Sequence, residues 1–409
     1  MTMFLSLTPR AEAWNQFKQY IKAGPNETET VNICNAVNRI TAQDIISPMN
    51  LPGFARSTKD GYAVPASSTF GASEGLPALL TLVGSIRMGE HTDLSLNPHE
   101  CAEIATGGMM PEGADSVIMV EMCEAMDDKI IAVADSVAPG ENVLSAEEDI
   151  PVGSLMLPRG KRLRPVDIAA LAATGITEVE VAQGPRVAII STGDELTDIY
   201  EIPRPGQVRD MNAYSLYSGI QAIGGIPKLW GIVKDDCASM QDMIAKAHKE
   251  SDMVVVSGGS SIGERDFTRN AIQTLGSPGV ITHGIAIKPG KPTILAVANE
   301  KPIIGLPGHP MSCMIVFNLF VAPAIARWMG GTLYRQTIQA RVIRNVASAA
   351  GREDYLSVRL FREKGEVWAE PIFSKSAAIS GLISSDGVMI VPEHAEGVEK
   401  GDWVSVILF

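Results

Sequence analysis

Residues 186–331 alternate short apolar runs with longer amphipathic ones, and this alternation constrains the fold more than any other feature of the sequence. Residues 253–256 are four apolar side chains flanked by polar ones, which is typical of a strand buried on both faces of a parallel sheet. Helices are expected between the strands, for example over 212–223 and 237–248. The alternation predicts a doubly wound parallel α/β domain, which binds ligands beyond the carboxyl ends of its strands.

The segments on either side of this domain follow other patterns. Thr8 as an N-cap, followed by Pro9 at the first helical position, predicts the start of a helix that runs to about Ile21. Residues 51–149 are short β-type runs cut by glycine and proline, which indicates a small β-rich domain. The last 75 or so residues return to a β pattern typical of a small terminal β-barrel. With 409 residues, the chain is too long for a single core.

The overall charge and the cysteines exclude several classes of protein. The formal charge is −13 and there is no run of five basic residues, so a nucleic-acid partner is not expected. Five dispersed cysteines indicate reduced thiols in a cytoplasmic protein. No signal peptide is recognisable at the N-terminus. The longest apolar stretch, residues 314–326, contains Asn318 and is too short for a bilayer, so we expect no membrane partner.

Loops that follow predicted strands are the first place to look for chemistry. In the loop at 191–195, Thr192 and Gly193 allow backbone N–H groups to approach a phosphate, while Asp194 and Glu195 could hold Mg²⁺. A simple strand-to-loop turn, in which the acids cap a helix, explains the same residues equally well.

A second loop, from Ser257 through Gly258, Gly259 and Ser260 to Gly263 and Asp266, leads from a buried strand into a helix. It matches neither a Walker A motif nor a dinucleotide-binding motif. Its glycines and serines at a helix N-terminus would still form an anion site. The alternative is a flexible turn.

Two further loops carry proline-bounded polar residues. Lys288 and Lys291 lie in a Lys-Pro-Gly-Lys-Pro sequence, where they could act as point charges beside phosphate, although most lysines are solvated surface groups. Pro307 and Pro310 bound a tight turn into a helix, and His309 between them is expected to be structural.

In the β-rich segment the stretches around Asp60 and Thr106 could be plain hairpin turns. The acids at 147–149 could be a solvated face or a metal site.

The order of these blocks resembles one family, the molybdopterin molybdenumtransferases of molybdenum-cofactor biosynthesis, called MoeA and, in animals, the E domain of gephyrin. The matching blocks cover nearly the whole chain. They are residues 51–54, 60–63, 106–107, 111–115, 148–150, 191–196, Asp210 with Asn212, 235–236, 257–266, 288–292 and 306–312.

The resemblance implies a multidomain α/β plus β architecture, with an α/β domain like that of molybdopterin adenylyltransferase, and an elongated homodimer. The implied domains are an N-terminal helix (1–26) packing with the α/β domain, a small connecting α+β domain (27–50 and 151–183), a β-rich domain (51–150), the α/β domain (184–332) and a C-terminal β-barrel (333–409). The implied reaction joins adenylyl-molybdopterin and molybdate, cleaves the pyrophosphate bond with Mg²⁺ assistance and releases AMP. A molybdopterin adenylyltransferase is a candidate partner.

The resemblance also implies roles for individual residues. The implied catalytic carboxylates are Asp60, Asp149, Glu195, Asp235 and Asp266, with Glu195 and Asp266 as metal ligands. The implied substrate-binding residues are Thr106, Thr192, Gly193, Asp194, Ser257, Gly258, Gly259, Ser260, Gly263, Lys288, Lys291, Pro307, Pro310, Arg352 and Ser376. Asp60, Thr106 and Asp149 are expected to complete the site across the dimer.

The chain departs from the family pattern at three places. Residues 56–59 replace the usual Asn-Ser-Ala-Met, His309 stands where asparagine is common, and Ser260 where valine is frequent. Alternative functions are a non-catalytic molybdopterin-binding scaffold, the same reaction with tungstate, a molybdate-responsive DNA-binding regulator and a generic nucleotide hydrolase. The retained acids favour the enzyme, and the β pattern of the C-terminus disfavours the regulator.

Overall fold

The computed structural model describes residues 7–21, 27–259, 267–333 and 335–409, and the chain divides into two compact units. The first unit contains the residues up to 43, 159–164 and 179–409. The second contains 44–158 and 165–178. Each unit is described by itself below.

A six-stranded sheet forms the centre of the first unit, in the order β16-β13-β17-β21-β20-β18. The strands are β13 (Arg186–Thr192), β16 (Ile226–Val233), β17 (Met253–Ser257), β18 (Pro278–His283), β20 (Ile294–Ala298) and β21 (Lys301–Leu306). The first four in spatial order run parallel, as predicted.

One strand, β20, runs antiparallel to its neighbours, a detail that the prediction of a parallel sheet did not contain. Only Asn299 and Glu300 connect β20 to β21, and both have positive φ. A two-residue connection of this kind makes a tight hairpin and leaves no room for the crossover that parallel strands require.

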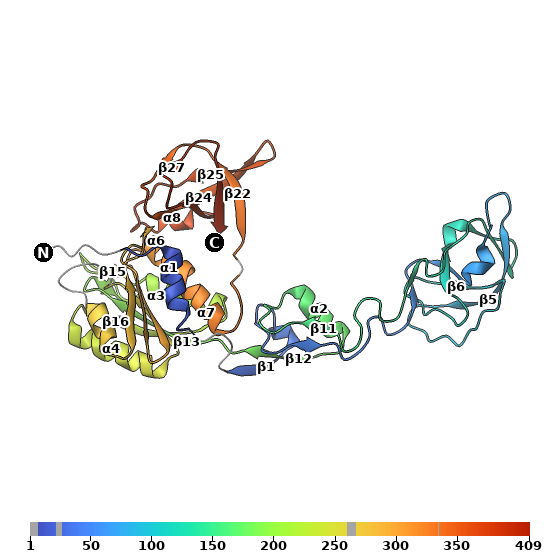
Figure 1. Ribbon diagram of the computed structural model, residues 1–409, viewed down its shortest axis with the longest axis horizontal. Coiled ribbons are helices and arrows are strands. Elements are labelled where there is room, and N and C mark those ends of the chain that lie inside the picture. Colours follow the sequence, from blue (N-terminus) through green and yellow to red (C-terminus); the bar gives the residue numbers. More distant parts are fainter. Residues whose placement is uncertain (1–6, 22–26, 260–266, 334) are drawn as a thin grey trace. The chain divides into compact units, whose positions relative to one another are not determined.

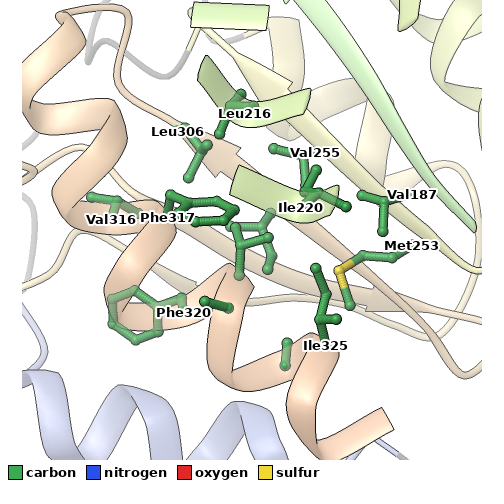
Figure 2. Close-up of a cluster of buried hydrophobic side chains, with 14 of the residues drawn as sticks. Val187, Leu216, Ile220, Met253, Val255, Leu306, Val316, Phe317, Phe320 and Ile325 are labelled. Carbon is green, nitrogen blue, oxygen red and sulfur yellow. The ribbon is translucent and has the colours of Figure 1, made fainter. Parts of the chain in front are cut away.

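Both faces of this sheet are buried because successive side chains alternate between two separate cores. Val187 and Ile189 of β13 point into one core, and Ala188 and Ile190 point into the other. Figure 2 shows the first core, where Val187, Met253 and Val255 meet helix residues such as Phe317. The run of apolar residues at 253–256 is therefore buried on both sides, as expected of a doubly wound domain.

Helices cover the two faces in unequal numbers. The first core is covered by α1 (Arg10–Lys18), α3 (Asn212–Ala222), α6 (Pro310–Val316) and α7 (Ala322–Trp328), and the second by α4 (Cys237–Glu250) and α5 (Phe267–Gln273). The Nε atom of Arg327 in α7 donates hydrogen bonds to the carbonyl oxygens of Lys18 and Ile21, which holds α7 beside α1 (Figure 1).

The first helix is shorter than predicted. Pro9 occupies the N-cap position, and Thr8 instead forms a backbone bridge with Ile285, so the interpretation of Thr8 as the cap was wrong. Thr8 N–H donates to the carbonyl of Gly284, and its carbonyl accepts from Ala286 N–H. Thr8 therefore extends the backbone pairing of the domain and is not free to cap the helix.

A π-helical turn, Phe317–Val321, joins α6 and α7 into one helical run from Pro310 to Trp328. The run has 19 residues and a mean hydropathy of 1.5, so it is longer than the apolar stretch recognised in the sequence and could cross a membrane by length and composition. Within the molecule, however, 78% of it is buried. It packs as a core helix of the α/β domain.

The C-terminal region closes into a β-barrel, as predicted. Its strands are β22 (Thr337–Val342), β24 (Glu353–Glu363), β25 (Glu366–Pro371), β26 (Gly387–Val391) and β28 (Trp403–Leu408). The ring closes because β24 pairs with both β25 and β26, while β22 and β28 complete the circuit. A short strand, β19 (Ile287–Lys288), pairs with β24 and links the barrel to the α/β domain.

The second unit is built on a six-stranded sheet in the order β7-β4-β6-β5-β9-β8. These strands are β4 (Gly61–Val64), β5 (Ala78–Ile86), β6 (Glu100–Ile104), β7 (Ser116–Met119), β8 (Cys123–Ala125) and β9 (Ile130–Val133). Outside this sheet, the short strand β3 (Arg56–Ser57) pairs with β10 (Val143–Leu144). The unit also holds the pair of β2 (Ile45–Ile46) and β11 (Leu155–Leu157), and the helix α2 (Pro165–Ala173).

Candidate functional site

A cavity of about 850 Å³ opens at the carboxyl edge of the α/β sheet. It lies where β13, β17 and β21 end, which is the position that doubly wound folds use for ligands. Its lining consists of Thr192, Gly193, Glu195, Leu196, Val208, Arg209, Asp210, Met211, Asn212, Asp235, Ser257, Gly258, Gly259, Pro292, Pro307, Gly308, His309, Pro310, Ser312 and Ala377.

The loop after β17 brings bare backbone to the cavity. Gly258 has φ +96° and Gly259 has φ +61°, a region that side chains disfavour. A Cβ atom on Gly258 would lie 2.2 Å from the carbonyl oxygen of Thr192, and one on Gly259 would lie 2.6 Å from Thr268 Oγ1. Both positions therefore require glycine, and the exposed backbone can approach an anion closely.

The loops after β13 and β16 contribute three of the predicted acids: Asp194 and Glu195 follow β13, and Asp235 follows β16. Asp235 Oδ1 accepts a hydrogen bond of 2.5 Å from Thr192 Oγ1, and Asp194 Oδ1 accepts one of 3.3 Å from the Asp235 backbone N–H. The carboxylate of Glu195 lies over Gly193, where a Cβ atom would be only 2.6 Å from Glu195 Oε2. Glu195 and Asp235 thus line the cavity, while Asp194 supports the loop.

The neighbouring Asp236 has a purely structural role. Its side chain accepts from the Ser239 backbone N–H at 2.9 Å and caps α4. Hydrogen bonds from Ser239 lower the pKa of Asp236 below its usual value. One of two adjacent acids therefore caps a helix and the other faces the cavity, a distinction that the sequence left open.

Asn212 ties three parts of the cavity floor together. Its Nδ2 donates to Ser257 Oγ at 3.0 Å and to the Gly308 carbonyl oxygen at 2.8 Å. These two hydrogen bonds fix the end of β17 and the loop after β21 against α3. Behind this bond Cys313 is fully buried, and burial raises the pKa of its thiol to about 12. The thiol therefore stays protonated and takes no part in anion binding.

The loop after β21 is a tight turn into α6, with Pro307 and Pro310 both on the cavity wall. His309 between them also lines the cavity, and its Nδ1 lies 2.8 Å from Ser376 Oγ of the C-terminal region. Met311 N–H donates to the Ser376 carbonyl oxygen at 3.3 Å. These two contacts bring Ala377 of the C-terminal region into the cavity wall.

The predicted cations form a separate group beside the cavity. Lys288 Nζ lies 3.5 Å from Asp354 Oδ2, and Arg352 Nε donates to Asp354 Oδ1 at 2.9 Å. Asp354 is buried, with 3% of its surface exposed. Lys291 is exposed and adjoins Pro292, which does line the cavity. The structure thus places these cations next to the cavity and not in its wall.

In the second unit, Asp60 and Thr106 come together. Asp60 Oδ1 accepts a 2.7 Å hydrogen bond from the Thr106 backbone N–H. Hydrogen bonds from the Thr106 backbone and side chain lower the pKa of Asp60. Asp60 is therefore an exposed carboxylate held in its ionised form, which a plain hairpin turn does not require.

Asp149 lies in a different part of that unit. Its backbone N–H donates to the Leu51 carbonyl oxygen at 3.1 Å. The adjacent acids hold their own loop: Glu147 accepts from Asn50 Nδ2 at 2.7 Å, and Glu148 accepts from the Ser145 N–H at 2.8 Å. The acids at 147–149 do not form a metal site among the described residues.

Three predicted residues, Ser260, Gly263 and Asp266, lie outside the residues that the structure describes. Among the described residues, no group of three histidine, cysteine or acidic side chains could hold a metal ion. The described part of the cavity therefore offers Glu195 and Asp235 as the carboxylates available to a cation.

Sequence reasoning missed several residues that line the cavity, above all Arg209, Asn212 and His309. Asp210 and Asn212 belong to a block that resembles the MoeA family, but they were not assigned to the site. A signal was present, because residues 193–211 follow a buried parallel strand and precede a helix, which is where ligand-binding loops lie. His309 was interpreted as structural, and it does bond to Ser376.

Family models match three consecutive parts of the chain. The MoeA N-terminal region (domain I and II) matches residues 8–175, a probable molybdopterin binding domain matches 188–327, and the MoeA C-terminal region (domain IV) matches 339–409.

Individual relatives agree over the full length. A putative molybdopterin biosynthesis protein of Methanocaldococcus jannaschii is 35% identical, with 100% of both chains covered. A molybdopterin molybdenumtransferase of Bacillus subtilis is 30% identical, over 98% of this chain and 94% of the relative. The crystal structure of a molybdopterin biosynthesis MoeA protein from Pyrococcus horikoshii OT3 is 31% identical, covers 99% of this chain and 100% of the relative, and has a TM-score of 0.85. The chain belongs to the MoeA family.

Proposed function

We propose that the chain converts adenylyl-molybdopterin and molybdate into molybdenum cofactor and AMP by cleaving the pyrophosphate bond. The broader role is that of a transferase in molybdenum-cofactor biosynthesis, which family membership and the molybdopterin molybdenumtransferase relatives support. The observation that carries the detailed reaction is the cavity at the carboxyl edge. Its glycine backbone suits a phosphate, and its carboxylates suit a cation that accompanies the phosphate.

Magnesium fits the described residues. Mg²⁺ prefers oxygen ligands and is usually held by one or two carboxylates together with water and substrate phosphates. Glu195 and Asp235 line the cavity and supply such oxygens, while the third carboxylate of the wall, Asp210, accepts a hydrogen bond from the Ala213 N–H. The ion would neutralise charge on the phosphate during cleavage. Thr192 fixes the position of the Asp235 carboxylate through its 2.5 Å hydrogen bond.

Molybdate would bind beside the cavity at the cations Lys288, Lys291 and Arg352. Asp354 orients two of them, since Lys288 and Arg352 both contact its carboxylate. Ser376 holds the C-terminal region at the cavity, because its hydroxyl bonds His309 and the adjacent Ala377 is in the cavity wall. Two anions with like charge could thus be held in neighbouring places, each beside its own cations.

AMP release tests the reaction. We expect purified protein to release AMP from adenylyl-molybdopterin only after molybdate is added, and Glu195→Ala to lower the rate roughly 100-fold. Glu250→Ala, which removes an exposed acid paired with Lys228, is the matched control and should leave the rate unchanged. No release by the wild type, or an unchanged rate in Glu195→Ala, would contradict the proposal. Release without molybdate would indicate a nucleotide hydrolase instead.

We also propose that the enzyme works as a homodimer, with Asp60, Thr106 and Asp149 of one copy completing the site of the other. The exposed position of Asp60 supports this, because its carboxylate, whose pKa Thr106 lowers, remains open to a second copy of the chain. Asp60→Ala and Glu195→Ala variants are each expected to be inactive. Subunit exchange between them should restore roughly a quarter of the wild-type rate, because half of the dimers are mixed and each has one intact site. No recovery in a mixture that has exchanged subunits would show that both residues act within one copy.

Cytoplasmic location and a hand-over of substrate from a molybdopterin adenylyltransferase are further parts of the proposal. Two of the five thiols, Cys101 and Cys313, are buried, and all five are free in the structure, which suits a reducing compartment. Cell fractionation tests the location. Co-purification with the adenylyltransferase, lost when its product is depleted, tests the hand-over.

A further inference from the structure

The wall of the cavity is poor in positive charge for a site that holds a phosphate. Its described residues include three carboxylates, Glu195, Asp210 and Asp235, and a single lysine or arginine, Arg209. The cations predicted from the sequence lie beside the cavity, and Asp354 contacts two of them, Lys288 and Arg352. Among the described residues of the wall, Arg209 is therefore the one side chain with a permanent positive charge that an anionic ligand can contact.

Arg209 is anchored by one part of its guanidinium group. Its Nε donates to the carbonyl oxygens of Ile199 at 3.0 Å and Glu201 at 3.1 Å. Arginine has five N–H donors, and the other four belong to the two terminal nitrogens. In the part of the chain that the structure describes, these terminal nitrogens form no hydrogen bond or ion pair. The side chain is thus held in place while most of its donors remain open to a ligand.

Two of the three carboxylates around it accept hydrogen bonds from groups other than Arg209. Asp210 is buried and accepts from the Ala213 N–H at 3.1 Å, and Asp235 accepts from Thr192 Oγ1 at 2.5 Å. The strand that carries Arg209, β15 (Val208–Arg209), is fixed to β14 (Leu196–Thr197), and Val208 N–H donates to the Glu195 carbonyl oxygen at 2.8 Å. Arg209 is therefore presented on paired backbone beside the acids and is not neutralised by them.

We propose that Arg209 is the phosphate-binding side chain of this cavity, and that it couples phosphate binding to the loop at 198–207. The proposal rests on the proposed function for the identity of the ligand, a nucleoside monophosphate or its pterin anhydride. The coupling follows from the geometry, because Arg209 lines the cavity and its guanidinium also holds Ile199 and Glu201. The loop presents Tyr200 and Ile202, which are 88% and 87% exposed.

Binding of AMP and adenosine separates a phosphate contact from a structural effect. Arg209→Ala is expected to weaken AMP binding about tenfold or more in equilibrium titrations with Mg²⁺, and to leave adenosine binding unchanged. Arg209→Lys should recover little, because an ammonium group lacks the planar fork needed to hold two carbonyls and a phosphate together. Arg204→Ala is the matched control: Arg204 lies on the same loop and does not line the cavity, so its loss should not affect AMP binding.

Each other outcome has a definite meaning. Unchanged AMP binding in Arg209→Ala overturns the proposal, as does an equal loss for AMP and adenosine, which would mean that Arg209 acts only by shaping the loop. If Arg209→Ala does not fold, Arg209→Lys provides the same comparison. Failure of the proposed function is distinguishable: the wild type would then release no AMP on adding molybdate, while AMP binding still depended on Arg209.

Discussion

His309 Nδ1 lies 2.8 Å from Ser376 Oγ, and this bond joins the N-cap of α6 in the α/β domain to the loop before α8 (Ser380–Ile383) in the C-terminal region. Met311 N–H adds a second tie to the Ser376 carbonyl oxygen. Because Ala377 lines the cavity, the C-terminal region is part of the cavity wall and not only an appended barrel.

Loss of the His309–Ser376 bond should loosen this wall. His309→Ala and Ser376→Ala are each expected to raise the KM for adenylyl-molybdopterin roughly fivefold with a smaller change in kcat, which corresponds to about 1 kcal/mol for one hydrogen bond. His309→Asn should retain most of the affinity, since an amide can also bond a hydroxyl group. The double alanine variant should be no worse than either single variant, because both remove one shared bond. Fully additive losses would show that the two residues act separately.

The hydrogen bonds between Thr106 and Asp60 predict the titration of that acid. They lower the pKa of Asp60, so they favour folding above the pKa that Asp60 has in the unfolded chain, and this contribution is lost as the pH falls through the lower, folded-state pKa. Thr106→Val removes the side-chain hydroxyl and keeps the backbone N–H. The pKa of Asp60 should therefore rise part of the way to its usual value, as followed by carboxyl carbon NMR.

Ser68→Ala is a suitable control for that titration, since it removes a hydroxyl group elsewhere in the same unit, where Ser68 Oγ accepts from the His99 N–H. It should leave the pKa of Asp60 unchanged. An identical Asp60 titration in Thr106→Val and wild type would show that the hydroxyl contributes nothing.

The backbone of Gly258 should not tolerate a side chain. Gly258→Ala adds strain at φ +96° and a collision 2.2 Å from the Thr192 carbonyl oxygen, so we expect a loss of about 2–4 kcal/mol in unfolding free energy and failure to bind AMP. Gly206→Ala is the matched control, because its φ is +89° but nothing lies within 4 Å of the added atom. It should cost only roughly 1 kcal/mol. Equal losses in thermal unfolding would show that the collision is relieved by movement.

Lys288 and Arg352 should contribute to the binding of molybdate and contribute little to the binding of the nucleotide. Lys288→Ala and Arg352→Ala are expected to raise the KM for molybdate about tenfold, with AMP binding close to wild type, because neither residue lines the cavity. Arg359→Ala removes an exposed arginine from the same strand as Asp354 and serves as the control. A similar loss of AMP binding and molybdate affinity would show that the two anions share one site.

Much of the fold follows from local pattern. Residues 253–256 form a buried strand because every side chain is apolar, and Pro310 begins a helix because its fixed φ suits the first turn. The loops at 191–195, 257–259 and 306–310 meet in one cavity because parallel strands end at the same edge of a sheet. These features need only short-range information.

The sequence by itself thus determined the α/β domain, the β-barrel and the loops that carry the cavity. Only the tertiary structure decided which charged side chains enter it: Arg209 lines the wall, whereas Lys288 and Arg352 lie against Asp354. It also decided that Asp235 faces the cavity while Asp236 caps a helix. The physical reason is that helices and strands are determined largely by neighbouring residues, whereas the partner of a long charged side chain can lie far away in the sequence. Lys288 and its partner Asp354, for example, are 66 positions apart.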